Sequence, residues 1–173
     1  MTDTTIENYQ ERTMRTMTDL GSKEVDGAHM VIGMVTEVEE MKEGVFNKDK
    51  VNIREEHGDC NWYIANTCNI YDLDFKELYA KSLKQEFTKF SLGPLADLHK
   101  RELAYGKEMD VDLLEKELVK FVKFLSLIAA SYDFEYEESL QININKLYKR
   151  YPEKFSNEAA LNRDLDEEYK TLT

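Results

Sequence analysis

The chain is poor in residues that interrupt helices or crosslink segments. Its 173 residues include two prolines, seven glycines and two cysteines. So few helix breakers favour long helices and argue against a loop-rich β fold. Cys60 and Cys68 lie eight positions apart within one predicted helix, too far to form a disulfide. We therefore expect both to be reduced residues of the core.

Long apolar runs and an excess of basic residues are also missing. The most apolar stretch, 121–130, is shorter than the ~18 residues that a membrane-spanning helix needs. The opening MTDTTIENYQERT lacks the apolar segment of a secretory signal, so we expect a cytoplasmic protein with no membrane partner. The formal net charge of −12 argues against a nucleic-acid partner, because such binders normally present a basic face.

The residues that are abundant are typical of a helical protein. Charged residues make up 34% of the chain and hydrophobic residues 42%, and the length suffices for one domain with a core. The spacing of the apolar residues predicts an all-α helical bundle that forms a single domain over 1–173. Gly21 and Gly44 are expected to mark turns. We expect helices near 5–18, 28–43, 51–71, 73–90, 94–106, 112–131, 135–150 and 156–170.

An acidic pair lies on the apolar face of the segment 30–41. At about 100° per residue, Glu37 falls inside the apolar arc of this helix and Glu40 lies at its edge. Carboxylates are rarely buried unless they are paired or hold a metal. The arc consists of Met30, Gly33, Met34, Val35, Val38 and Met41.

A second acidic pair repeats this arrangement in the segment 53–71. Glu56 lies in the middle of its apolar stripe and Asp59 at the border, whereas Glu55 points elsewhere. Acids three positions apart are common by chance in this chain, so a solvated face is the alternative for either pair alone. The shared placement on two apolar faces favours a ligand. The stripe consists of Ile53, Cys60, Tyr63, Ile64, Thr67 and Ile70.

Four carboxylates between two packed helices would repel one another. A pair of charges at about 4 Å costs roughly 4 kcal/mol at an effective dielectric constant of about 20. A hard divalent cation removes this penalty, and an all-oxygen ligand set suits Mg²⁺ or Mn²⁺ rather than zinc. The sequence therefore predicts a metal site formed by Glu37, Glu40, Glu56 and Asp59.

The chain also contains a weak internal repeat. A shift of 60 to 61 positions aligns the hydrophobic pattern of 30–90 with that of 91–151, which predicts a degenerate duplication. The second copy would lack a metal site, because Lys100 and Lys120 stand where two of the four acids would fall. We expect these to be ordinary surface lysines.

The acidic pairs belong to a longer pattern that resembles the MazG-like all-α nucleoside triphosphate pyrophosphohydrolases, relatives of the dimeric dUTPases and all-α dCTPases. The family signature is ExxE followed by ExxD. Here it reads GMVTEVEEM and REEHGDCNWYIAN, with 15 residues between Glu40 and Glu56. The opening YQERTMRT and the ending NINKLYKRYPEKFSNEAALNRDL are also similar to the family. Compact members lack about sixty residues that intervene here between the ExxD and Lys/Arg helices, an insertion that the duplication would explain.

The resemblance implies a bundle of the all-α NTP pyrophosphatase type that hydrolyses a (d)NTP to the monophosphate and pyrophosphate. It assigns the catalytic and metal-binding roles to Glu37, Glu40, Glu56 and Asp59, with Mg²⁺ as the cofactor or Mn²⁺ in its place. Two alternatives stay open. One is an enzyme with a narrow base preference, of the dUTPase or dCTPase type. The other is a non-catalytic bundle that binds a nucleotide or a partner protein.

The resemblance also implies substrate contacts. Asn143, Lys146 and Arg150 fall within one sector of a predicted helix and match a substrate-side motif, although a solvated basic helix end is the alternative. Tyr63 matches a tyrosine near the phosphates, with core packing as the alternative. Trp62 is expected to face away from the acids and pack against another helix. Family members commonly assemble as homodimers or homotetramers, and phages often encode such chains.

Overall fold

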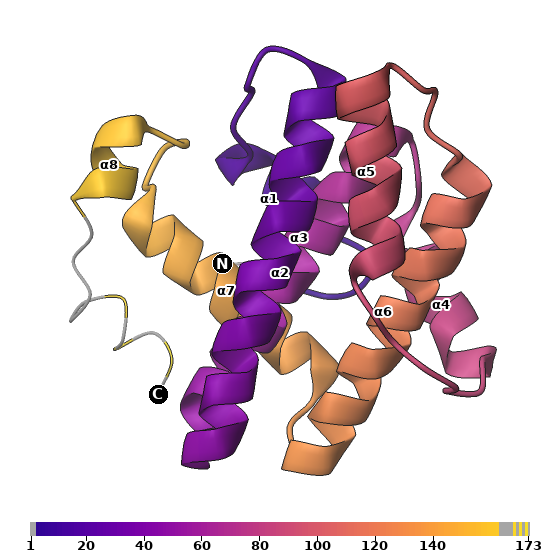
Figure 1. The fold of residues 1–173 in the computed structure, drawn as a ribbon. Helices are drawn as coiled ribbons and strands as arrows, with labels where there is room; N and C mark the ends of the chain where they lie inside the picture. The colour runs from indigo at the N-terminus through magenta and orange to yellow at the C-terminus, as the bar shows by residue number, and fades with distance from the viewer. Residues whose placement is uncertain (1–2, 163–167, 169, 171, 173) are drawn as a thin grey trace.

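The computed structural model describes residues 3–162, 168, 170 and 172, and that part of the chain is all-α (Figure 1). The prediction of an all-α fold is therefore confirmed, and both cysteines are free and buried. No helix in the described part is long and apolar enough to cross a membrane. The elements are α1 (Tyr9–Thr13), the 3-10 helix η1 (Met14–Thr16), α2 (Lys23–Asn47), α3 (Lys50–Tyr71), α4 (Phe75–Lys84), α5 (Gly93–Tyr105), α6 (Val111–Tyr132), α7 (Tyr136–Arg150) and α8 (Asn157–Leu161).

The predicted limits of α3, α5, α6 and α7 agree with the structure to within one or two residues. The starts of α3 and α6 are fixed by aspartates at the N-cap. The carboxylate of Asp49 accepts hydrogen bonds from the backbone N–H groups of Val51 and Asn52, and Asp110 accepts one from Leu113. These bonds satisfy N–H groups that lack a partner within the helix.

The prediction for α2 was wrong at both ends. The helix begins at Lys23, where Ser22 caps the N–H of Val25, and it continues past Gly44 to Asn47. Gly44 therefore marks close packing and not a turn. A Cβ there would lie 2.5 Å from the Asn52 side-chain oxygen, so the missing side chain allows α2 and α3 to approach each other. Gly21, with φ of 97°, does lie in a turn.

The predicted helix 73–90 is also too long, because α4 ends at Lys84. Phe90 leaves the helical path to stack on Phe121 and Phe124, with ring centroids 4.6 and 4.8 Å away. Packing against α6 therefore decides the course of this segment.

The predicted helix 5–18 is broken at its start and shortened at its end. The backbone N–H groups of Thr4 and Ile6 donate to Gln141 and Glu137 of α7, and Met17 is extended. At the other end of the chain, the described part of the predicted helix 156–170 contains α8. Residues 163–167 and 169 of that prediction lie outside the described residues.

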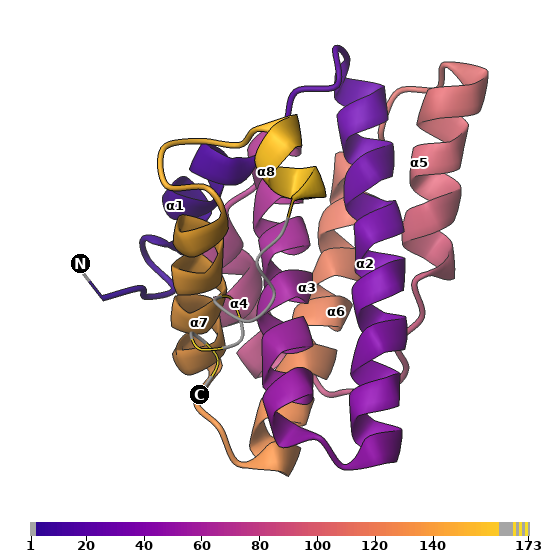
Figure 2. The ribbon, with the colours of Figure 1, turned by 90° about the vertical axis from the view of Figure 1, so that its left-hand side faces the viewer.

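The long helices form a layered bundle in which α2 lies between α3 and α5 (Figure 2). α7 packs on α3, and α4 packs on α6. α3 is buried against α2 on one face and α7 on another, so polar residues on both of these faces lie inside the protein.

The predicted internal repeat has a structural counterpart in the capping residues of α3 and α6. α3 and α6 each have 22 residues and begin after aspartates 61 positions apart, Asp49 and Asp110. Each ends at an aspartate in the left-handed conformation, Asp72 at φ 57° and Asp133 at φ 62°. These correspondences support a duplication of 30–90 and 91–151, which stays a prediction.

Candidate functional site

A cleft of about 330 Å³ lies between α2, α3 and α7, a size within the usual range for small-molecule sites. Its acidic side contains the four carboxylates predicted from the sequence, together with Glu55. The remaining lining comes from aromatic, aliphatic, polar and basic residues, including two that precede α2 and two that follow α7. They are Thr16, Thr18, His29, Trp62, Tyr63, Asn143, Leu147, Arg150, Tyr151 and Phe155.

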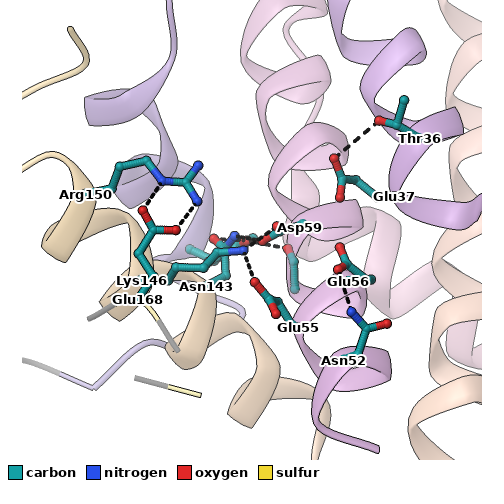
Figure 3. A network of polar contacts seen from close by, with 12 residues as sticks. Thr36, Glu37, Asn52, Glu55, Glu56, Asp59, Asn143, Lys146, Arg150 and Glu168 are labelled. Carbon is teal, nitrogen blue, oxygen red and sulfur yellow. Dashed lines mark hydrogen bonds and ion pairs between the residues drawn. The ribbon is translucent and has the colours of Figure 1, made fainter. Parts of the chain in front are cut away.

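Three of the four predicted ligands converge. One carboxylate oxygen each from Glu37, Glu56 and Asp59 lie within 4.8 Å of one another, and Glu56 is 4% exposed. Figure 3 shows Glu37 on one helix facing Glu56 and Asp59 on the next. Glu40 lines the same cleft but is exposed and lies outside this trio.

The apolar arc expected on α2 needs one correction. Val35 is 40% exposed, whereas Met34 and Val38 are buried. The buried face is therefore narrower than predicted on that side, and Glu37 is half-buried where it opens into the cleft.

Two glycines bring the helices of the site together. A Cβ at Gly58 would lie 2.6 Å from the backbone oxygen of Ser139, so α7 crosses α3 beside Asp59. A Cβ at Gly33 would lie 2.1 Å from the ring of Tyr63, so this ring packs directly on the α2 backbone. Tyr63 thus lines the cleft and packs against the core.

Two residues of α7 bind the two carboxylate oxygens of Asp59. Asn143 Nδ2 donates to Asp59 Oδ1 at 2.8 Å, and the Lys146 ammonium donates to Oδ2. Lys146 also donates to Glu55 Oε1 at 3.0 Å. Burial opposes the charged lysine, but the charges of Asp59 and Glu55 outweigh it and raise the pKa of Lys146 to about 12.

The three predicted substrate residues on α7 occupy different positions. Asn143 and Arg150 line the cleft. Lys146 is 2% exposed and lies behind Asp59, outside the lining residues. The expectation that Glu55 points elsewhere was wrong, because Glu55 lines the cleft and pairs with Lys146. Because α7 covers that side of α3, the helix has a second buried face that the first apolar stripe does not predict.

Trp62 also departs from expectation. Its indole N–H donates to Thr16 Oγ1 at 3.0 Å, so it does pack against the η1 segment. Its ring nonetheless lines the cleft, next to Tyr63 at a centroid distance of 4.9 Å. His29 lines the cleft as well and meets the Tyr63 ring edge-on. Its Nδ1 is buried and has no hydrogen-bond partner among the described residues.

Arg150 is engaged with the C-terminal part of the chain. Its Nε donates to Glu168 Oε1 at 2.8 Å and its NH2 group to Oε2 at 2.5 Å (Figure 3). This is the two-pronged geometry with which arginine binds carboxylates and phosphates. Glu168 is 4% exposed. It was not identified from the sequence, because helical spacing relates residues of one helix and says nothing of a partner 18 positions beyond Arg150.

The acid cluster strongly disfavours its own full ionisation. Burial and then the charge of Asp59 raise the pKa of Glu37 to about 7. The same two causes, followed by the neighbouring Glu37, raise the pKa of Glu56 further. The clustered carboxylates, which repel one another when ionised, and the oxygen-only donor set fit Mg²⁺ or Mn²⁺. Glu37, Glu56 and Asp59 would hold the ion, with Glu40 beside them.

We predict that the protein in EDTA becomes less stable as the pH rises from 5 to 8. The pKa of Glu37 is raised from 4.5 to about 7, so the folded protein keeps a proton that the unfolded chain releases between these values. The corresponding stability is fully present below pH 4.5 and is lost as the pH rises through about 7. Thermal unfolding of wild type and Glu37→Gln across this range is the test. The variant should show a flatter profile, and an equally steep one would contradict the prediction.

No family model, curated protein or solved structure matches the chain. Any assignment of function therefore rests on the site geometry and on the motifs quoted above.

Proposed function

We propose that the chain is a metal-dependent nucleoside triphosphate pyrophosphohydrolase of the MazG-like type. The observation that carries the proposal is the convergence of Glu37, Glu56 and Asp59 within a cleft that also contains Arg150. Acidic and basic groups on one cleft suit a ligand that brings its own cation and several anionic oxygens. A metal-bound triphosphate has both.

Each part of the cleft has a role in this proposal. Glu37, Glu56 and Asp59, with Glu40, hold the divalent cation, which supplies positive charge to the triphosphate and lowers the pKa of an attacking water. Arg150 binds phosphate oxygens with its planar guanidinium. The rings of Trp62 and Tyr63, which line the cleft side by side, offer apolar surface to the base and sugar.

Lys146 and Asn143 act on the acids in this proposal. Their bonds to Asp59 orient that carboxylate before the cation arrives, so less reorganisation accompanies binding. Lys146 also balances part of the negative charge of the site when no cation is bound. The sequence-based role of Lys146 as a direct phosphate contact would require it to leave this buried position.

The nucleotide products test the proposal. Incubation with a panel of canonical and modified (d)NTPs in Mg²⁺, followed by chromatography, should give the monophosphate and pyrophosphate. Hydrolysis of nucleotides that carry one particular base would support the dUTPase or dCTPase type. Hydrolysis of many different nucleotides would support a pool-cleaning enzyme. Release of the nucleoside diphosphate and orthophosphate, or binding without turnover, would contradict the proposal.

We predict that Glu168→Gln lowers the KM for the triphosphate by about threefold to tenfold. Glu168 holds the Arg150 guanidinium in a charged two-pronged bond, with which substrate phosphate must compete. Hydrogen bonds to charged groups contribute about 1.5–3 kcal/mol, and weakening one by removing the charge changes affinity by up to roughly tenfold. Steady-state kinetics should show the effect in KM. Glu158→Gln, at an exposed position, is the control. An unchanged KM for Glu168→Gln would show that Glu168 does not compete with substrate.

A further inference from the structure

A buried hydrogen-bonded path leads from α1 to the acid cluster. The Tyr9 hydroxyl lies 2.9 Å from Asn143 Oδ1 and 3.2 Å from the backbone oxygen of Gly58. Asn143 Nδ2 lies 2.8 Å from Asp59 Oδ1. Tyr9 is fully buried and Asn143 is 2% exposed. The path therefore joins three different helices and reaches the cleft at Asp59.

The hydrogen-bonding partners fix the orientation of the Asn143 side-chain amide. An ionised carboxylate only accepts hydrogen bonds, so the NH₂ end of the Asn143 amide must face Asp59. Its oxygen then needs a donor, which the Tyr9 hydroxyl supplies. With the amide reversed, its oxygen would lie against the carboxylate. Burial, and after it the charge of Asp59, raises the pKa of Tyr9 well above its usual value, so the hydroxyl keeps its proton.

The position of Tyr9 is itself well defined. Its ring packs against Phe75 at a centroid distance of 5.5 Å, and α1 lies against both α3 and α7. The aromatic ring accounts for the packing at this position, and a phenylalanine would provide it equally. The hydroxyl has a separate effect, because it is the part of the side chain that reaches Asn143.

We propose that Tyr9 is a positioning residue for the metal site: its hydroxyl fixes the Asn143 amide, which fixes Asp59 toward a divalent cation. The inference rests on the proposed metal-dependent function. It assigns a role to the motif YQERTMRT, in which Tyr9 lies and which the acidic signature does not explain. Groups that orient a ligand typically contribute about 10-fold to 100-fold to metal affinity.

Binding of Mn²⁺ alone, followed by paramagnetic resonance of the free ion, is the test. Tyr9→Phe should weaken Mn²⁺ binding by about tenfold. The matched control is Tyr136→Phe, which also removes a buried hydroxyl, here one that donates to Asn61 at 2.5 Å. Neither Tyr136 nor Asn61 lines the cleft, so this control should bind Mn²⁺ as wild type does.

A double-mutant cycle separates positioning from general loosening of the fold. In the background of Asn143→Ala, adding Tyr9→Phe should weaken Mn²⁺ binding no further, because the hydroxyl acts through that amide. Equal losses in both backgrounds, or wild-type affinity for Tyr9→Phe, would overturn the positioning role. If wild type itself binds no Mn²⁺, the metal site fails and the positioning role with it, an outcome that differs from both of these.

Discussion

Replacing Glu56 with glutamine is expected to abolish metal-dependent hydrolysis and, at the same time, to stabilise the protein in EDTA. Glu56 is buried beside Glu37 and Asp59, and its raised pKa reflects burial first and these charges next. Glutamine keeps the shape of the side chain and can still accept the hydrogen bond from Asn52 Nδ2. It removes the negative charge that the cation requires and that the folded protein tolerates poorly.

The activity loss should be on the order of 10³-fold or more, because a catalytic cation contributes several kcal/mol and each 1.36 kcal/mol is tenfold in rate. Pyrophosphate release and thermal unfolding in EDTA at pH 8 are the two measurements. Glu39→Gln is the control, since Glu39 is exposed and pairs with Lys42. Retained activity in Glu56→Gln, or a lower unfolding temperature in EDTA, would contradict the role assigned to Glu56.

Replacing Lys146 with methionine is expected to lower the free energy of unfolding by about 3–5 kcal/mol at neutral pH in EDTA. Removing one partner of a buried ion pair leaves the other charge uncompensated, which typically costs this much. Here the ammonium is 2% exposed and bonds both Asp59 and Glu55. Methionine approximates the length of the side chain, so the loss of charge dominates.

Urea unfolding of Lys146→Met beside Lys100→Met tests this prediction. Lys100 pairs with Asp97 on the surface, and exposed pairs contribute little. Mg²⁺ should restore part of the stability of Lys146→Met, because the cation supplies positive charge next to Asp59. A loss no larger than that of Lys100→Met would mean that Lys146 does not balance the charge of the acids.

The helix pattern and the acidic positions could be read from the sequence for physical reasons. α3, α6 and α7 have regular apolar spacing and start and end close to the predicted residues. The three converging acids lie on the apolar faces of α2 and α3, so helical geometry alone places them between the two helices. Glu40, expected at the edge of its arc, is exposed as that position implies.

The contacts between distant segments could not be predicted in this way. A helical wheel places Asn143, Lys146 and Arg150 in one sector but does not say which neighbour they meet. The approach of α7 to α3 at Gly58 turns Lys146 inward, onto Asp59 and Glu55. Arg150 pairs with Glu168, which lies 18 positions further along the chain. Phe90 lies outside the helix predicted for it and stacks on Phe121 of α6. These outcomes depend on tertiary packing, which has no local signal.

The most direct test of the proposed function is pyrophosphate release by the wild-type protein from a mixture of (d)NTPs, measured in Mg²⁺ and again in EDTA. We predict pyrophosphate and nucleoside monophosphate in equal amounts in Mg²⁺ and neither in EDTA. Absence of pyrophosphate in Mg²⁺, from protein that is folded and helical, would contradict the assignment of Glu37, Glu56 and Asp59 to a catalytic metal site.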